Sequence, residues 1–166
     1  MSSAIEVLSG QYETIGEGVA AVVEGLTPEQ LAHHVAPGAN TIGWLVWHLL
    51  RVQDDHVSDV ADREQVWTSG GWVDRFGLPF ERDATGYGQS AAEVDAVRTE
   101  AGLLAGYGAE VLAATQSFLA GLSEPDLDRI VDESWDPPVS LGVRLQSVIG
   151  DDLKHLGQAE LLRGLL

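Results

Sequence analysis

The stretch at residues 41–50, TIGWLVWHLL, decides the fold class of this chain. A helix formed by these residues would have almost no polar face, so it must be surrounded by other secondary-structure elements. The apolar residues Leu45, Leu49 and Val52 continue at the spacing of one helix face. We therefore expect a buried helix from about residue 40 to residue 62, with other helices packed around it.

Three further long helices are expected on the same criterion, and no stretch alternates convincingly with the two-residue period of a strand. Their apolar patterns place them at residues 3–26, at residues 100–122, and from residue 140 to the C-terminus. Short helices are expected after Thr27 and Ser90. Each of these residues can cap a helix with a glutamine or glutamate three positions later.

The connection between the second and third long helices is unusually long. Residues 66–89 are rich in turn-forming residues but also carry tryptophan and phenylalanine. A connection of this length is either disordered or functional, and its aromatic content favours an ordered cover over one end of the bundle. The sequence thus predicts an all-α fold in a single domain of residues 1–166: a four-helix bundle with a long crossover loop between helices 2 and 3.

Composition restricts the partners of the protein. The 166 residues include 26 acidic and nine basic side chains, which give a net charge of −17. Such a field repels phosphate backbones, so we expect no nucleic-acid partner. The longest apolar run is far shorter than a membrane span, and the N-terminus lacks a secretion signal. We expect a cytoplasmic protein with a small-molecule substrate and no membrane partner. With no cysteine, any thiol chemistry needs a thiol from outside the chain.

His48 is the first candidate for a chemical role, because it lies inside the apolar stretch that opens this section. Burying an unpaired imidazole costs on the order of 1–3 kcal/mol, so His48 must be hydrogen-bonded or coordinated. A hydrogen-bonded core histidine is the common outcome. His56, two turns further along and closer to the centre of the apolar stripe, is the rival candidate. His33 and His34 lie in the short helix after Thr27, just before the sequence stops being helical, and are expected at the surface or in capping roles.

Residues 151–155, DDLKH, offer the partners that a metal-binding histidine needs. Asp151 and His155 are four residues apart and share one helix face. Asp152 also reaches His155, at a spacing of three, and it lies closer to the centre of the helix's apolar stripe. Spacing alone leaves both aspartates open, together with a simple hydrogen-bonded pair. One histidine from the second helix with an Asp/His pair from the fourth would form a two-histidine, one-carboxylate metal site.

The sequence resembles the DinB-like superfamily of metal-binding four-helix proteins over nearly its whole length. The resemblance rests on residues 41–49, on the Trp/Gly-rich loop through residues 76–78, and on residues 151–158, DDLKHLGQ. The last segment resembles the superfamily's His-x-x-x-His-x-Gly-Gln signature, with Asp151 in place of the first histidine. The maleylpyruvate isomerase branch is similar in using a carboxylate there. This register favours Asp151 over Asp152.

The resemblance implies a metal site of His48, Asp151 and His155 that holds Zn²⁺ or Ni²⁺. It also implies transfer or isomerisation with a low-molecular-weight thiol, mycothiol among them, and pairing into a homodimer. We expect Trp44, Trp72 and Gln158 to line the substrate pocket, with the loop aromatics Trp67 and Phe76 as further walls or as ordinary core. Two other functions stay open: a non-enzymatic small-molecule-binding protein and a metal-dependent hydrolase.

Overall fold

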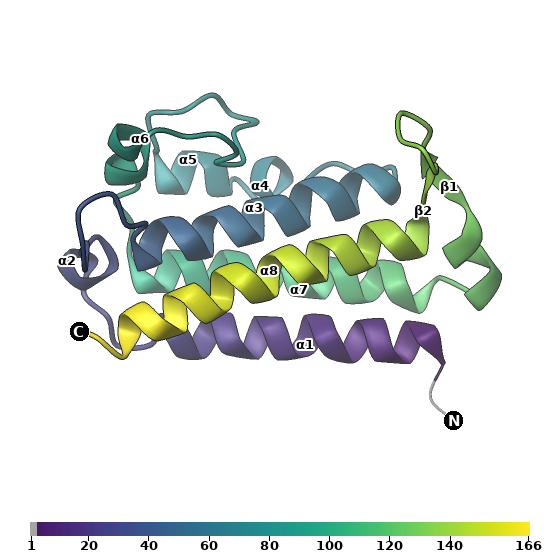
Figure 1. Cartoon of the computed structure of the whole chain (residues 1–166), viewed down its shortest axis with the longest axis horizontal. Coiled ribbons are helices and arrows are strands. Elements are labelled where there is room, and N and C mark those ends of the chain that lie inside the picture. Colours follow the sequence, from purple (N-terminus) through teal and green to yellow (C-terminus); the bar gives the residue numbers. More distant parts are fainter. Residues whose placement is uncertain (1–2) are drawn as a thin grey trace.

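The computed structural model describes residues 3–166 and contains a bundle of four long helices (Figure 1). Helix α3 packs most extensively against α8, and α1 packs against α7 and α8. The predicted all-α four-helix bundle is confirmed, and each helix begins and ends within three residues of its expected position. The long helices are α1 (Ala4–Val23), α3 (Ile42–Val60), α7 (Ala101–Ala120) and α8 (Leu141–Arg163).

Helices α3 and α7 run in the same direction, while α1 and α8 run in the opposite one (Figure 1). The chain between α3 and α7 must therefore return along the bundle, and it does so along the side of α3. This crossover segment, residues 61–100, contains three short helices. They are α4 (Val66–Ser69), α5 (Trp72–Phe76) and α6 (Ala91–Ala96). The expected capping box at Ser90 starts α6, and that at Thr27 starts the short α2 (Pro28–Leu31).

A small hairpin at the opposite end of the bundle corrects the expectation of no strands. After the 3-10 helix η1 (Glu124–Asp128), the strands β1 (Ile130–Asp132) and β2 (Val139–Ser140) pair antiparallel. Strands of three and two residues are too short to show an alternating pattern in the sequence. The hairpin leads directly into α8, because the last residue of β2, Ser140, is also the N-cap of that helix.

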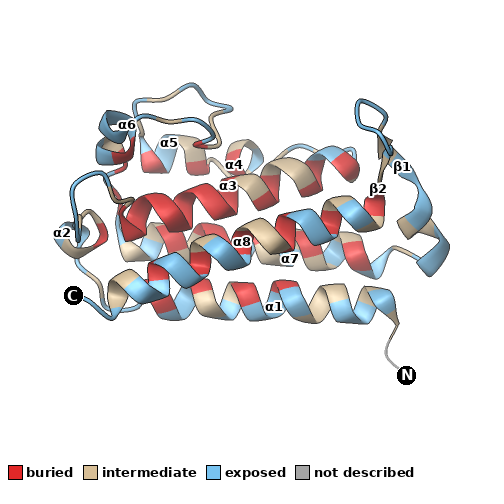
Figure 2. Ribbon diagram, in the orientation of Figure 1, coloured by how far each residue is buried: buried red, intermediate tan, exposed pale blue. Residues whose placement is uncertain are grey.

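The core lies between the long helices, and its densest part surrounds the first half of α3. Figure 2 shows this half buried all round, whereas the other three helices keep exposed faces. On α1 the buried side chains follow helical spacing, at Tyr12, Ile15, Val19 and Val22. Among residues 3–166, no helix combines the length and the hydropathy that a membrane crossing requires.

Asp54 on α3 binds the start of the crossover segment. Its carboxylate accepts hydrogen bonds from the backbone N–H groups of Val66, at 2.9 Å, and of Trp67, at 2.7 Å. These are the first free N–H groups of α4, which a carboxylate satisfies well. The Tyr107 hydroxyl on α7 donates to the same carboxylate at 2.8 Å. Asp54 therefore joins three elements at one buried point.

Arg51, one turn before Asp54, binds the same segment at two points. Its guanidinium donates to the backbone oxygen of Ala84 at 3.1 Å and to the side-chain oxygen of Gln65 at 2.7 Å. The side chains of Arg51 and Asp54 are both fully buried, with 3.5 Å between Nη1 and Oδ2. This pair holds the crossover segment against α3 at residues 65–67 and at residue 84.

Candidate metal centre

His48 lies on the buried half of α3, with 6% of its surface exposed. Its Nδ1 is 2.5 Å from the backbone oxygen of Thr85 in the crossover segment. A carbonyl oxygen only accepts hydrogen bonds, so Nδ1 carries the proton and Nε2 keeps a free lone pair. Burial lowers the pKa of His48, and the bond to Thr85 opposes this only in part. The imidazole is therefore held neutral, as a metal ligand must be.

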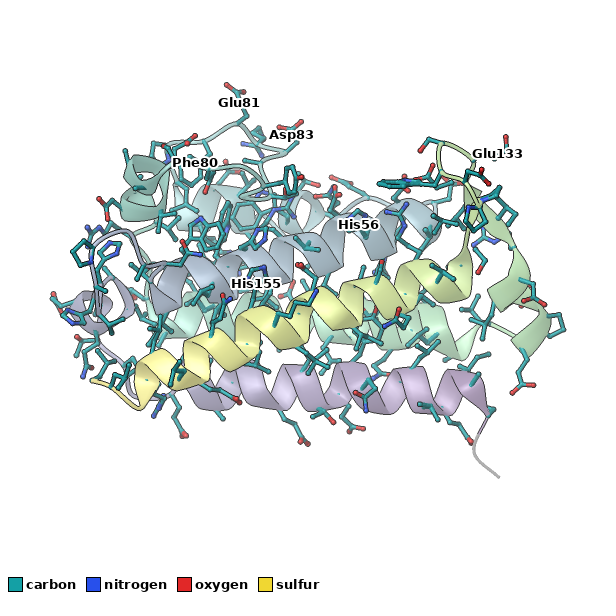
Figure 3. All side chains as sticks on the ribbon, viewed as in Figure 1. His56, Phe80, Glu81, Asp83, Glu133 and His155 are labelled. Carbon is teal, nitrogen blue, oxygen red and sulfur yellow. The ribbon has the colours of Figure 1, made fainter. Side chains whose placement is uncertain are left out.

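His155 and Asp151 share one face of α8, as their spacing predicted. Figure 3 shows His155 near the middle of α8, between that helix and α3. Its Nδ1 is 3.2 Å from the side-chain oxygen of Gln158, one turn further on. With the amide oxygen in that position, Nδ1 is again the protonated nitrogen and Nε2 is free. Nε2 lies 3.7 Å from the Asp151 Oδ2.

The three side chains converge at the interface of α3 and α8. One ligand atom from each of His48, Asp151 and His155 lies within 4.8 Å of the other two. The two imidazole rings meet edge to face, with 4.8 Å between their centroids. Donor atoms bound at about 2.1 Å to a tetrahedral ion lie about 3.4 Å apart, close to the separation of His155 and Asp151. The donor set and its geometry therefore fit a divalent ion.

Asp152, the alternative carboxylate, points elsewhere. It occupies the central position of the α8 apolar stripe and is fully buried. Among residues 3–166 it has no hydrogen-bond partner, and burial raises its pKa well above the usual range, with the charge of Asp151 adding to the effect. The structure thus brings Asp151, and not Asp152, to the two histidines.

His56, the alternative histidine, carries its proton on the opposite nitrogen from His48. Its Nδ1 lies 3.1 Å from the Arg144 Nη1. A guanidinium only donates, so Nδ1 accepts and the proton of the neutral ring is on Nε2. Burial lowers the pKa of His56, and the charge of Arg144 lowers it further. Neither ring nitrogen of His56 offers a lone pair to a metal in this arrangement.

Trp44, predicted to line the substrate pocket, packs on both candidate histidine ligands. Its ring stacks on that of His48, with centroids 4.7 Å apart and planes at 16°. It also meets the edge of His155, at 6.2 Å. The indole N–H donates to the side-chain oxygen of Gln89, at 2.7 Å. These contacts place Trp44 against the two imidazoles, but it does not line the hollow beside them.

The other two predicted pocket residues lie differently. Trp72 is buried against Tyr107 and Phe76, and its N–H bonds to Glu110 on α7. The structure does not bring it to the histidines. Gln158 lies beside His155, where it orients the imidazole, and it also borders a separate hollow at the end of α8.

A hollow opens directly beside the three converging side chains, between α3 and α8. Its volume is about 260 Å³. His48 and Asp151 lie at one end and His56 and Ser147 at the other, while Val52 and Val148 form apolar walls. Tyr87 of the crossover segment stands at the rim, with 94% of its surface exposed. The hollow gives a small molecule access to the candidate ligands.

Two contributors to the site were not predicted from the sequence, the Thr85 carbonyl and Gly86. A backbone carbonyl has no signature of its own. The segment at residues 85–88, TGYG, does carry a signal, because two glycines surround an exposed aromatic residue. Both glycines adopt positive φ, 94° at Gly86 and 72° at Gly88, a conformation that glycine adopts without strain. This turn delivers the Thr85 oxygen to His48.

Comparison with solved structures shows the same architecture elsewhere. A conserved protein from Enterococcus faecalis superposes with a TM-score of 0.91 at 28% sequence identity, over 99% of this chain and 98% of that one. A DinB-like protein from Bacillus cereus shares the fold, with a TM-score of 0.61 at 23% identity, over 95% and 89% of the two chains. No curated protein sequence matches significantly.

The bundle has the fold of a DinB-like protein, and a family model confirms the predicted resemblance. A sequence model described as mycothiol-S-transferase matches residues 8–166, which is nearly the whole chain. The chain therefore belongs to the mycothiol-S-transferase family.

Replacing Gly86 by alanine is expected to weaken metal binding about 10- to 100-fold, the range for losing a group that orients a ligand. The new Cβ would lie 2.7 Å from the His48 Nδ1 and 3.0 Å from the Trp47 ring. The imidazole must then leave the Thr85 carbonyl. Competition with a chelator of known affinity measures the change.

Gly88→Ala is the matched control for this prediction. Gly88 also has a positive φ, but a Cβ there meets no atom within 4 Å. The control therefore carries the backbone strain without the collision with His48. Equal metal affinities for the two variants would contradict the role assigned to Gly86.

Proposed function

We propose that this protein is a metal-dependent transferase that joins a low-molecular-weight thiol to a small electrophile. His48, Asp151 and His155 would hold a divalent ion, Zn²⁺ or Ni²⁺. The observation that carries the proposal is the arrangement of two histidines whose Nδ1 atoms are both engaged by acceptors. Their Nε2 lone pairs converge with one carboxylate beside an open hollow.

Three protein ligands are typical of catalytic metal sites, because they leave coordination positions for an exogenous molecule. When bound, a divalent ion lowers the pKa of a coordinated thiol, so that thiolate forms near neutral pH. The chain has no cysteine, so the thiol must be a co-substrate. Membership of the mycothiol-S-transferase family supports mycothiol as that thiol.

The residues of this chain have distinct roles in the proposed reaction. The Thr85 carbonyl and Gln158 hold the two histidines with Nε2 facing the site. Trp44 covers both imidazoles and keeps water from that side. The hollow between α3 and α8 receives the electrophile. Its carbon forms a bond with the thiol sulfur, and the electron pair displaced at that carbon goes to a leaving group or into the conjugated system of an unsaturated ketone. The thiol proton ends on the leaving group or on the carbon next to the new carbon–sulfur bond.

The test begins with elemental analysis of protein purified without an affinity tag. We expect about one divalent ion per chain, removable by chelator and restored by adding metal. The loaded protein should then accelerate consumption of mycothiol by an electrophile, with the S-conjugate detected by mass spectrometry and glutathione as the comparison thiol.

Other outcomes would contradict the proposal in favour of a different function. Ester hydrolysis that needs the metal but no thiol would indicate a hydrolase. A chain that cannot be loaded with metal, yet binds a small acid, would indicate a non-enzymatic binding protein.

A further inference from the structure

The far end of the hollow contains a hydrogen-bond donor that the metal centre does not use. Figure 3 shows His56 further along α3 than the level of His155, toward the end that carries β1 and β2. Eight residues separate His56 from His48, which corresponds to about 12 Å of helix. Both line the same hollow. A molecule bound there would have its reactive end at one histidine and its other end at the second.

Arg144 fixes which hydrogen-bonding group His56 presents. Because Arg144 donates to Nδ1, the ring proton is on Nε2, at the opposite edge of the imidazole. Asp132 holds Arg144 in place through a contact of 2.8 Å. Within residues 3–166, the structure shows no acceptor for the Nε2–H of His56. The half-buried ring therefore keeps a free donor while it lines the hollow.

The charges around His56 restrict what that donor can bind. Arg144 is the nearby cation, and Asp132 pairs with it. The carboxylates of Asp55, Asp59 and Asp151 also act on His56. A divalent ion carrying one thiolate would balance the charge of Asp151. The charges of Asp55 and Asp59 would then leave the His56 end of the hollow negative. The net charge of the whole chain, −17, adds to the negative potential at this end. A carboxylate is therefore disfavoured there, whereas an uncharged oxygen acceptor is not.

We propose that His56 binds the carbonyl oxygen of an uncharged electrophile through its Nε2–H, with Arg144 as the positioning residue. The inference rests on the proposed function, because it takes the hollow beside His48 and Asp151 as the binding place of the electrophile. The apolar walls at Val52 and Val148 suit a hydrocarbon body, and the volume of about 260 Å³ suits a small one. The substrate class is thus a small, uncharged, unsaturated ketone or a compound of similar chemistry, and not a dicarboxylate.

The test uses the metal-free full-length chain, so that it does not depend on metal binding or thiol transfer. The probe is 2-cyclohexen-1-one, and 1-cyclohexene-1-carboxylate is its charged counterpart of similar shape. The chain has no cysteine to react with the enone. Spectra of protein with ¹⁵N-labelled histidine should show His56 protonated at Nε2 and His48 protonated at Nδ1. The enone should shift the His56 signal with a dissociation constant in the millimolar range, and the carboxylate should not.

Variants of His56 distinguish the effect of its hydrogen-bond donor from the effect of its ring shape. His56→Phe should weaken enone binding about fivefold, the loss of one neutral hydrogen bond. His56→Gln keeps a donor and should stay within about twofold of the unsubstituted protein. His33→Phe, at an exposed position, is the control and should change nothing. In metal-loaded protein, His56→Phe should raise KM for the enone and also lower kcat, because thiolate addition places negative charge on the carbonyl oxygen that His56 binds, while metal content stays the same.

Three results would overturn the inference. They are a His56 proton on Nδ1, unchanged enone affinity in His56→Phe, and carboxylate binding as tight as that of the enone. If His56→Phe does not fold, the spectra of the unsubstituted protein and the His56→Gln titration still show whether His56 binds the enone. A chain that binds the enone at His56 but never loads metal would contradict the proposed function and leave this inference supported.

Discussion

Alanine at His48 or His155 is expected to lower metal affinity by more than about 100-fold and to abolish thiol transfer. Losing a residue that merely orients a metal ligand already lowers metal affinity about 10- to 100-fold. Here one of the metal-binding atoms is itself lost. Two donors from different helices would remain, and α3 and α8 cannot shift to compensate because their interface is closely packed. Elemental analysis after dialysis, followed by the mycothiol assay, measures both effects.

Substitutions at Asp151 and His33 sharpen this prediction. Asp151→His restores the His-x-x-x-His pattern that the superfamily shows at this place and should retain metal. Asp151→Asn, which removes the charge and keeps the shape, should lose most of it. His33→Ala controls for loss of an exposed histidine. Undiminished metal content in both His48→Ala and His155→Ala would place the metal elsewhere and contradict the assignment.

Arg51→Met is expected to lower the free energy of unfolding by about 3–5 kcal/mol, the range for breaking a buried ion pair on one side. Asp54 would keep its charge in a fully buried position without its cationic neighbour. The oxygen atoms of Ala84 and Gln65 would also lose their donor. Denaturant unfolding of the metal-free chain, followed by circular dichroism, gives the value without a contribution from bound metal.

Arg82→Met is the matched control, because Arg82 and Asp74 form an exposed ion pair within the same crossover segment. Solvent screens such a pair, so the free energy of unfolding should stay nearly unchanged. Similar losses in the two variants would show that burial of the Arg51–Asp54 pair is not what stabilises the segment.

The Arg51–Asp54 pair also connects the fold to the candidate site. Arg51 binds the oxygen of Ala84, and the next residue, Thr85, provides the carbonyl that orients His48. A crossover segment that detached from α3 would take this carbonyl with it. We therefore expect His48 to lose its fixed proton position whenever the segment opens, and ¹⁵N-histidine spectra of the Arg51→Met variant would show this.

The helical fold could be predicted from the sequence because the signals for it are local. Apolar residues at helical spacing mark the long helices, and the capping boxes at Thr27 and Ser90 mark where α2 and α6 begin. The hairpin of β1 and β2 escaped prediction because its pairing depends on contact between segments, not on a pattern within either of them.

The candidate site was only partly accessible to the same reasoning. Spacing on α8 allowed both Asp151 and Asp152, and the apolar stripe pointed to Asp152, which is indeed the residue buried in the core. Resemblance to a family, and not periodicity, favoured Asp151. Adjacent helix positions differ by about 100° in direction, so the choice depends on where α3 lies relative to α8.

The sequence by itself determined where the helices form. Helix formation, capping and the apolar stripe of each helix depend on neighbours within one or two turns. Only the tertiary structure decided which nitrogen of each histidine is free. At His48 a carbonyl from 37 residues away accepts a hydrogen bond from Nδ1–H, and at His56 an arginine from 88 residues away donates to Nδ1. The side chains are chemically identical, so their opposite roles follow from partners that folding brings into contact.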